Sequence, residues 1–470
     1  MAPSAHILEN RLEYRWRGSG STRTSIHRRI GLNITTALVI ATTLAACHSP
    51  ADPASVPTDV ILVTWDTTRV DRLSVYANAP ATTPALAAFA REATVFERAY
   101  STSSWTLPAH ASMFTGKLPL GHGAHNNATG SMHLSQQISD QRFHLLRVNG
   151  LADEQTTLAE ILSARDYATG AFVGGPWLAP RFGAMQGFAT VDSAVDEIGG
   201  RRADVLTDRA LEWLGGLPRE RACFLFVNYF DPHWPYDPPE GYAELARGEA
   251  EAGPWDAYDG ELRFVDTQFA RLLDGLRSLG RYDDALVLVV SDHGDLFGEH
   301  DQTGHGDWLW EELIRVPFLV RYPRGLDAGR RRSEPVSVLD VPAIVAQTVP
   351  FSLPDDFTSQ PPGERTEVFA EVYRLEFSVR LKGPELDRDL FTILRWPWKL
   401  ILDSDGDAEL YDLTADPGEQ RNLAQHEPEK TQTLLTALEQ MRSDVVAPVQ
   451  SPVAVDDAMH EQLRGLGYLD

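Results

Sequence analysis

Three long apolar runs stand out along the chain, and each of them ends at polar residues. They cover residues 60–65, 223–230 and 285–290 and consist mainly of β-branched, leucine and aromatic residues. A continuous run of this kind predicts a strand buried on both faces, as in a parallel sheet that is covered by helices. Asp66 follows the first run, an Asp-Pro-His tripeptide ending at His233 follows the second, and Asp292 and His293 follow the third. Ligands of open α/β sheets bind at the carboxyl ends of the strands, so these polar residues are candidate site residues.

Segments with helical spacing of apolar residues separate the three runs. Between residues 258 and 279, apolar residues recur every three or four positions, and Gly280 is a typical helix end. Similar patterns predict helices at residues 84–92, 158–165 and 202–217, and a short strand at 168–173. This alternation predicts an α/β domain with a mixed, mainly parallel sheet sandwiched by helices, which we place at residues 59–360.

The pattern changes towards the C-terminus. Residues 325–365 are connections rich in Pro, Gly and charged residues, and short apolar runs follow from Glu367 onwards. Such runs predict a small antiparallel sheet, and the residues near 429–441 have a helical pattern. We therefore expect residues 361–470 to form a small C-terminal α+β subdomain.

The composition is that of a folded, acidic protein. The chain has 470 residues, of which 43% are hydrophobic and 9% aromatic, and its formal net charge is −25. This charge argues against nucleic acid as a partner, because phosphate backbones require a basic surface. The two cysteines, Cys47 and Cys223, form neither a CxxC motif nor a disulfide framework, and Cys223 reads as a small core residue.

The N-terminal residues have the pattern of a secretory signal. Residues 1–29 are basic and polar, and the apolar stretch 30–46 is too short for a comfortable membrane span. It ends in Leu-Ala-Ala-Cys47, which resembles a bacterial lipoprotein cleavage box. We predict that residues 1–47 are a lipoprotein-type signal peptide with Cys47 lipidated, rather than an uncleaved signal anchor. Residues 48–58 would be a tether, and the protein would be lipid-anchored on the outer side of a membrane of the bacterial cell envelope.

The stretch from Trp105 to Gly116 predicts the start of a buried helix. Pro108 suits a first helical turn, and small and apolar residues follow it, so Thr106 is expected just before the helix begins. A helix N-terminus favours anions, and a hydroxyl there could attack a phosphoryl or sulfuryl centre. From this stretch alone, the simpler interpretation is that Thr106 is a helix cap.

These motifs resemble the sulfatase family of the alkaline phosphatase superfamily. The stretch T-L-P-A-H-A-S-M-F-T-G resembles the signature C-x-P-x-R followed by T-G-R, S-D-H-G at 291–294 resembles S-D-N-G, and D-P-G-E-Q-R-N-L at 416–423 resembles the close of the family's C-terminal subdomain. The resemblance covers roughly residues 58–425 and 463–469. It implies an alkaline-phosphatase-like fold and an ester hydrolase, with Thr106 in the position of the nucleophile and His110 in that of the arginine.

Four departures define a branch of that family. Thr106 replaces the cysteine that other members oxidise to formylglycine, so no formylglycine is expected. His293 replaces the asparagine, as in phosphonate hydrolases and phosphotransferases, and a single Asp66 replaces two adjacent aspartates. The G-K-W-H segment of the sulfate pocket is not evident, since G-A-F-V-G-G-P-W occupies roughly its place.

The resemblance also implies the ligands of a metal site, namely Asp66, Thr106, Asp292 and His293. Two carboxylates, an imidazole and a hydroxyl suit one divalent cation, with Mn, Zn or Mg favoured over Ca because calcium prefers all-oxygen sites. His233, in the family's H-x-P context, and His305 are candidates for protonating the leaving group or contacting its oxygens. His110 is expected beside the nucleophile, where it either forms a hydrogen bond or only packs.

Three functions compete at this point. The first is a metal-dependent hydrolase that attacks sulfuric or phosphoric esters, of small molecules or glycans, with Thr106. The second is a phosphotransferase that moves a head group to an acceptor in the envelope, although such enzymes usually carry several transmembrane helices. The third is a non-catalytic binding protein, which the intact metal ligands disfavour. We expect phosphodiesters or phosphonates to react faster than aryl sulfates, and the sequence leaves the oligomeric state open.

Overall fold

In the computed structural model, the three apolar runs form neighbouring strands at the centre of an eight-stranded sheet. β1 (Val60–Trp65) lies between β8 (Leu286–Val290) and β7 (Cys223–Tyr229), and both pairings are parallel. Every residue of the three strands is buried, as expected for strands covered on both faces. The predicted bounds of these strands are therefore confirmed to within a residue.

The outer strands make the sheet a mixed one. β5 (Ala168–Val173) and β6 (Thr190–Asp192) extend the parallel part beyond β7, whereas β11 (Phe318–Arg321) runs antiparallel to β8. β2 (Thr94–Phe96) and β12 (Arg331–Arg332) complete the edge on the side of β11. The strand order is β12-β2-β11-β8-β1-β7-β5-β6.

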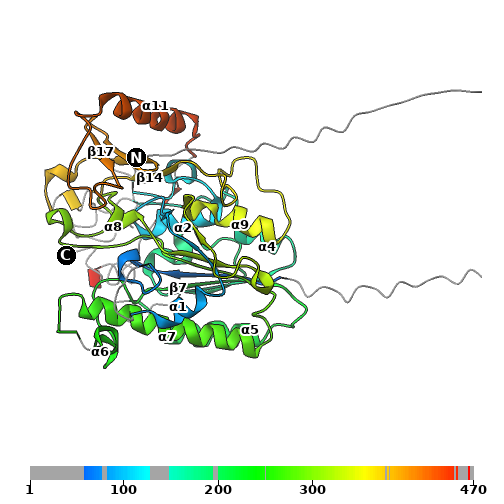
Figure 1. Cartoon of the computed structure of the whole chain (residues 1–470). Coiled ribbons are helices and arrows are strands. Elements are labelled where there is room, and N and C mark those ends of the chain that lie inside the picture. Colours follow the sequence, from blue (N-terminus) through cyan, green and yellow to red (C-terminus); the bar gives the residue numbers. More distant parts are fainter. Residues whose placement is uncertain are drawn as a thin grey trace, which may run out of the picture. The chain divides into compact units, whose positions relative to one another are not determined.

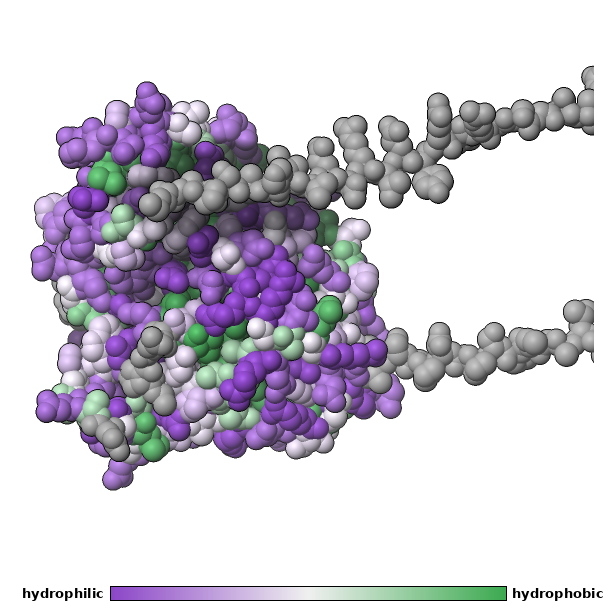
Figure 2. Space-filling model, in the orientation of Figure 1, coloured by the Kyte–Doolittle hydropathy of each residue, from purple (hydrophilic) through white to green (hydrophobic). Residues whose placement is uncertain are grey.

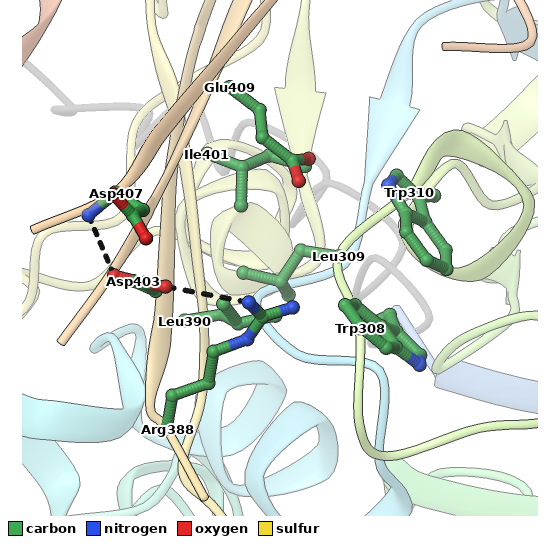
Figure 3. Close-up of a pocket in the computed structure, with 9 residues that line it drawn as sticks. All are labelled: Trp308, Leu309, Trp310, Arg388, Leu390, Ile401, Asp403, Asp407 and Glu409. Atoms are coloured by element: carbon green, nitrogen blue, oxygen red, sulfur yellow. Dashed lines mark hydrogen bonds and ion pairs between the residues drawn. The ribbon is translucent and has the colours of Figure 1, made fainter. Parts of the chain in front are cut away.

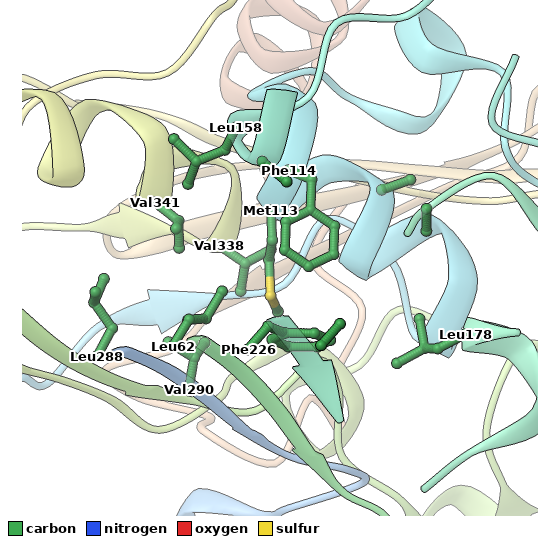
Figure 4. Packing of buried hydrophobic residues seen from close by; sticks show 14 of the residues in the cluster. Leu62, Met113, Phe114, Leu158, Leu178, Phe226, Leu288, Val290, Val338 and Val341 are labelled. Carbon is green, nitrogen blue, oxygen red and sulfur yellow. The ribbon is translucent and has the colours of Figure 1, made fainter. Parts of the chain in front are cut away.

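Helices cover both faces of this sheet (Figure 1). The helices on one side are α1 (Pro84–Phe89), α5 (Ala203–Gly215) and α7 (Asp256–Ser278), and those on the other are α2 (Thr106–Thr115), α4 (Leu158–Ser163) and α9 (Val341–Thr348). Alternate residues of β1 pack into the two hydrophobic cores, one on each face of the sheet, because successive side chains of a strand point to opposite faces. Leu62 packs with Met113 and Phe114 of α2 (Figure 4), and Ile61 packs with the α7 layer.

Helix α2 begins earlier than Pro108 suggests. Trp105, in an extended conformation, is the N-cap residue and makes no capping hydrogen bond with its side chain, and Thr106 is the first helical residue. The expectation that Thr106 precedes the helix is thus wrong by one residue. The helix ends at Gly116, whose φ of 62° is the left-handed conformation that glycine adopts freely. A Cβ atom there would lie 2.8 Å from the Phe357 ring, which also favours glycine at position 116.

A second, antiparallel sheet follows near the C-terminus. It has the order β14-β15-β16-β17, formed by Val368–Val372, Leu390–Arg395, Trp398–Asp403 and Ala408–Asp412. Helix α11 (Pro428–Asp444) packs on one face through Leu434 and Leu438. The other face packs against α8 (Glu311–Ile314). The predicted α+β character of this region is confirmed.

The structure describes residues 58–76, 82–126, 148–193, 200–248, 250–375, 378–379, 382–448, 451–453 and 464–465. The predicted signal peptide and nearly all of the tether lie outside these residues, so the prediction for Cys47 remains open. Among the described helices, none combines the length and the apolar character that crossing a bilayer requires. The face shown in Figure 2 is mainly hydrophilic, with small apolar patches, in keeping with the charged composition.

Candidate active site

The candidate residues meet because three adjacent parallel strands end at the same edge of the sheet. Thr64 of β1 pairs with Asn228 of β7 and with Val290 of β8, so the three chains leave the sheet almost level with one another. Asp66, His233 and the Asp292-His293 pair stand directly after these ends. Residues that are far apart along the chain are therefore neighbours in the fold.

Asp66, Asp292 and His293 form a compact, fully buried cluster. One potential ligand atom from each residue lies within 4.8 Å of the others. Asp66 Oδ2 accepts a hydrogen bond from Asn228 Nδ2 (3.2 Å), and Asp292 Oδ1 accepts bonds from the backbone N–H groups of Thr67 (3.2 Å) and His293 (2.9 Å). Each carboxylate is thus fixed by hydrogen bonds to one of its two oxygen atoms.

The second oxygen of each carboxylate has no hydrogen-bond partner among the described residues. These atoms are Asp66 Oδ1 and Asp292 Oδ2, and both are buried. Burial and the neighbouring Asp292 raise the pKa of Asp66 well above its ordinary value. Two buried carboxylates with unpartnered oxygens and a nearby imidazole nitrogen are a donor set that fits a divalent cation.

Thr106 lies beside this cluster. Its Oγ1 is 3.3 Å from His293 Nε2, and the residue is fully buried. His293 Nδ1 lies 2.8 Å from the Gly294 carbonyl, which can only accept, so we assign the proton to Nδ1 and the lone pair to Nε2. That lone pair faces the hydroxyl. The Thr106 side chain therefore belongs to the cluster and does not cap the helix.

The turn that presents His293 depends on a close backbone approach. A Cβ atom at Gly294 would lie 2.0 Å from the carbonyl oxygen of Glu312, and the Gly294 N–H donates to Leu313 (2.7 Å). Only glycine allows this contact. The Gly of the S-D-H-G motif thus serves the geometry of the His293 turn.

His110 lies one helical turn after Thr106 and is fully buried. Its Nδ1 is 2.9 Å from the Thr106 carbonyl, and its Nε2 is 3.1 Å from Thr64 Oγ1. The amide of Asn228 donates to Thr64 Oγ1 (3.1 Å) as well as to Asp66. Burial lowers the pKa of His110, so the neutral imidazole links helix α2 to strands β1 and β7 by hydrogen bonds.

His233 and His305 approach the cluster from two different loops. The His305 ring lies 4.5 Å from the His293 ring and 5.0 Å from the His233 ring, measured between centroids. His233 stacks on Phe230 (4.4 Å), and its Nδ1 is 2.6 Å from the Trp234 carbonyl. Burial and the neighbouring His305 lower the pKa of His233 to about 3. Thus all seven predicted site residues gather at one place.

Four further residues at this place were not singled out from the sequence. Asn228 and Thr67 hold the two carboxylates. Asp295 contacts His305, and Tyr236 donates a hydrogen bond to Asp295. Thr67 has a φ of 48°, a conformation that costs a β-branched residue about 1–3 kcal/mol. An Asn inside an apolar strand and a second Asp after S-D-H-G were the available signals for Asn228 and Asp295.

The segment in place of G-K-W-H has a packing role in the described part of the site. Trp177 is fully buried and meets Trp105, the N-cap of α2, edge to face at 4.8 Å. Trp177 therefore supports the start of helix α2, where Thr106 lies.

A small cavity of about 30 Å³ lies away from the cluster, where the segment 308–310 meets the C-terminal sheet (Figure 3). Trp308 and Trp310 stack there at 4.4 Å, and Arg388 lies over Trp308 and donates to Asp403 (3.4 Å). The cavity has room for about one water molecule. We regard it as a packing contact between the C-terminal sheet and the segment that follows His305.

Comparison with known proteins adds independent information. Residues 58–349 match the family model described as Sulfatase. The arylsulfatase of Clostridium perfringens is 22% identical over 447 residues, which cover 79% of this chain and 91% of that protein. The choline-sulfatase of Rhizobium meliloti is 32% identical over 201 residues, which cover 40% of this chain and 36% of that protein.

Solved structures show the same fold. The phosphonate monoester hydrolase of Agrobacterium radiobacter superposes with a TM-score of 0.62 at 20% identity, covering 82% of this chain and 95% of that one. The structure of BT4656 in complex with its substrate D-glucosamine-2-N,6-O-disulfate superposes with a TM-score of 0.64 at 16% identity, covering 82% and 97%. The predicted alkaline-phosphatase-like architecture is therefore confirmed.

Proposed function

The chain belongs to the sulfatase family of ester hydrolases, and from this membership we propose that it is a metal-dependent hydrolase with Thr106 as its nucleophile. The observation that carries the proposal is the position of the Thr106 hydroxyl, 3.3 Å from His293 Nε2 in a buried cluster with Asp66 and Asp292. Each of those carboxylates keeps one oxygen without a hydrogen-bond partner in the described structure. A helix cap would not need such surroundings.

Asp66, Asp292, His293 and the Thr106 hydroxyl would hold one divalent cation, with Mn, Zn or Mg favoured over Ca by the imidazole ligand. When bound, the cation supplies a Lewis acid that lowers the pKa of the hydroxyl and neutralises charge on the substrate oxygens. The N-terminal end of α2, where Thr106 is the first residue, favours the anionic group of the substrate.

Different residues carry out different steps of the proposed reaction. Thr106 Oγ1 releases its proton to solvent, which returns it when the hydroxyl is restored. The oxygen forms a bond to phosphorus or sulfur while the bond to the leaving oxygen breaks, and the electron pair of that bond stays with the leaving oxygen. His233 and His305 are placed to protonate it or to contact the substrate oxygens. Water then cleaves the threonyl ester and restores the hydroxyl.

We propose that Thr106 acts without conversion to formylglycine. Its Cβ carries a methyl group, so oxidation would give a ketone and not the aldehyde. A formylglycine hydrate can expel sulfate by collapsing to the aldehyde, whereas a threonyl ester must be cleaved by water at phosphorus or sulfur. We therefore infer a preference for phosphodiesters or phosphonates of small molecules or glycans over aryl sulfates.

The proposal is tested with purified protein and one leaving group on four ester types: sulfate, phosphate monoester, phosphodiester and phosphonate. We expect the highest kcat/KM for a phosphodiester or phosphonate with Mn or Zn. Thr106→Ala should abolish nearly all turnover and Thr106→Ser should keep part of it. The matched control is Thr115→Ala, which removes a buried hydroxyl from the same helix that donates to the Ala111 carbonyl (2.7 Å). A clear sulfate preference in calcium would overturn the phosphoryl preference, and an active Thr106→Ala variant would overturn the nucleophile.

We also propose that the mature protein begins at lipidated Cys47 and faces away from the cytoplasm. The basic, apolar and small-residue pattern that ends in Leu-Ala-Ala-Cys supports this location. Stable anchoring requires more than one acyl chain, as a lipoprotein cysteine carries.

A further inference from the structure

A buried carboxylate outside the metal cluster connects two of the loops at the site. Asp295 is 1% exposed, and its Oδ1 lies 3.2 Å from His305 Nδ1. Its Oδ2 accepts a hydrogen bond of 2.6 Å from the Tyr236 hydroxyl. The backbone N–H of Leu296 also donates to Oδ1 (3.2 Å), so both oxygens are occupied. Tyr236, Asp295 and His305 thus form a continuous hydrogen-bonded chain.

Further contacts fix Tyr236 and Asp295 in place. The Tyr236 ring stacks on Phe297 (5.3 Å) and meets Tyr258 edge to face (5.4 Å). Arg69 donates to the Asp295 carbonyl at 3.0 Å. Asp295 Oδ1 also accepts from the Leu296 N–H, so we assign it as the acceptor and His305 Nδ1 as the donor of the bond between them.

We propose that Asp295 and Tyr236 are positioning residues that orient the His305 imidazole, so that its Nε2 is the nitrogen offered to the leaving oxygen of the substrate. The inference rests on the proposed function, in which His305 lies beside the nucleophile cluster, 4.5 Å from the His293 ring. Tyr236 acts through Asp295 and follows His233 in the same loop, so it also joins the two histidine-bearing loops.

The proposal has a chemical consequence that a purely structural network lacks. When the bond between phosphorus or sulfur and the leaving oxygen breaks, the electron pair moves to that oxygen, and a poor leaving group needs the proton from His305 Nε2. The water that cleaves the threonyl ester then returns a proton to His305. A leaving group of low pKa departs without help. Misorientation of His305 should therefore slow alkyl esters much more than nitrophenyl esters.

The test compares Tyr236→Phe, His305→Ala and the double variant on one alkyl and one nitrophenyl ester of the preferred acid. We expect Tyr236→Phe to lower kcat for the alkyl ester about 10-fold and for the nitrophenyl ester less than about 2-fold, with KM nearly unchanged. In the His305→Ala background, Tyr236→Phe should have no further effect, because its action passes through His305. Asp295→Asn should show the same leaving-group dependence as a second variant.

Tyr229→Phe is the matched control, because it also removes a buried tyrosine hydroxyl, here bonded to Thr207 (2.7 Å). Thermal melts establish that each variant is folded. Equal losses on both esters, or the same loss with and without His305, would overturn the positioning role and leave the hydrolase standing. Failure of the wild type on every ester and metal would instead overturn the proposed function itself.

Discussion

Asp292→Asn should change stability in opposite directions with and without a divalent cation. The ligand atoms of Asp66 and Asp292 lie within 4.8 Å, and both residues are fully buried. At an effective dielectric constant of about 20, two charges at that distance repel by about 3 kcal/mol. Protonation of Asp66, whose pKa is raised by burial and by Asp292, relieves part of this repulsion. We therefore expect the variant to be more stable by about 1–3 kcal/mol in chelator.

The substitution preserves the local hydrogen bonds that hold the side chain. An asparagine oxygen can still accept from the N–H groups of Thr67 and His293, as Asp292 Oδ1 does. With cation at about 100 times its dissociation constant, the wild type gains about 2.7 kcal/mol, and the variant gains less because it has lost a charged ligand. With the cation bound, the wild type should then be as stable as the Asp292→Asn variant or more stable than it.

Thermal unfolding in chelator and in saturating Mn or Zn measures both effects. A chain of this size shifts its Tm by roughly 1–2 °C per kcal/mol, so differences of a few degrees are expected. Asp266→Asn is the control, since Asp266 is a buried aspartate that caps α1 by accepting from Ala85 (2.9 Å) and Leu86 (2.8 Å). Its effect should be the same in both conditions. An Asp292→Asn variant that loses the same stability with and without cation would refute a metal site at this cluster.

Three further predictions concern other parts of the chain. Burial, together with the neighbouring Asp231, raises the pKa of Glu261 to about 8. In the unfolded chain this carboxyl loses its proton above about pH 4.5, so the free energy of unfolding should fall as the pH rises from about 4.5 to about 8. Glu261→Gln should flatten the curve of Tm against pH over that range. Thr64→Val removes the hydroxyl between His110 and the Asn228 amide and should weaken metal binding about 10-fold in a titration, with kcat at saturating metal largely kept. Cys47→Ser should block processing or release the protein from the membrane fraction, and identical fractionation and migration of mutant and wild type would refute the lipid anchor.

The sequence was sufficient where one local pattern decides the structure. Continuous apolar runs predicted the three central strands, and polar residues at their ends predicted the positions of Asp66, Asp292 and His293. Parallel strands in register necessarily bring those ends together. The helix start at Thr106 was missed by one residue, because Pro108 fits any position of a first turn.

The second layer of the site depends on contacts that no local pattern contains. Tyr236 reaches Asp295 across 59 positions of the chain, and Asn228 reaches Asp66 across 162. The left-handed backbone of Thr67 is imposed by the Pro232 carbonyl and Asp292, which bond its hydroxyl and its N–H. The antiparallel direction of β11 is likewise set by its tertiary pairing with β8. The residue types indicate that these positions are polar, but the partners of these residues are determined only by the folded structure.

The most direct measurement of the central claim is the mass of the peptide that contains Thr106. In the resting protein it should equal the mass of unmodified threonine. After rapid quenching with a slow ester substrate, a fraction should gain the mass of one phosphoryl or sulfuryl group at Thr106, and His305→Ala should change the size of that fraction. A turning-over enzyme with no adduct at Thr106, together with ordinary kcat for Thr106→Ala, would contradict the account.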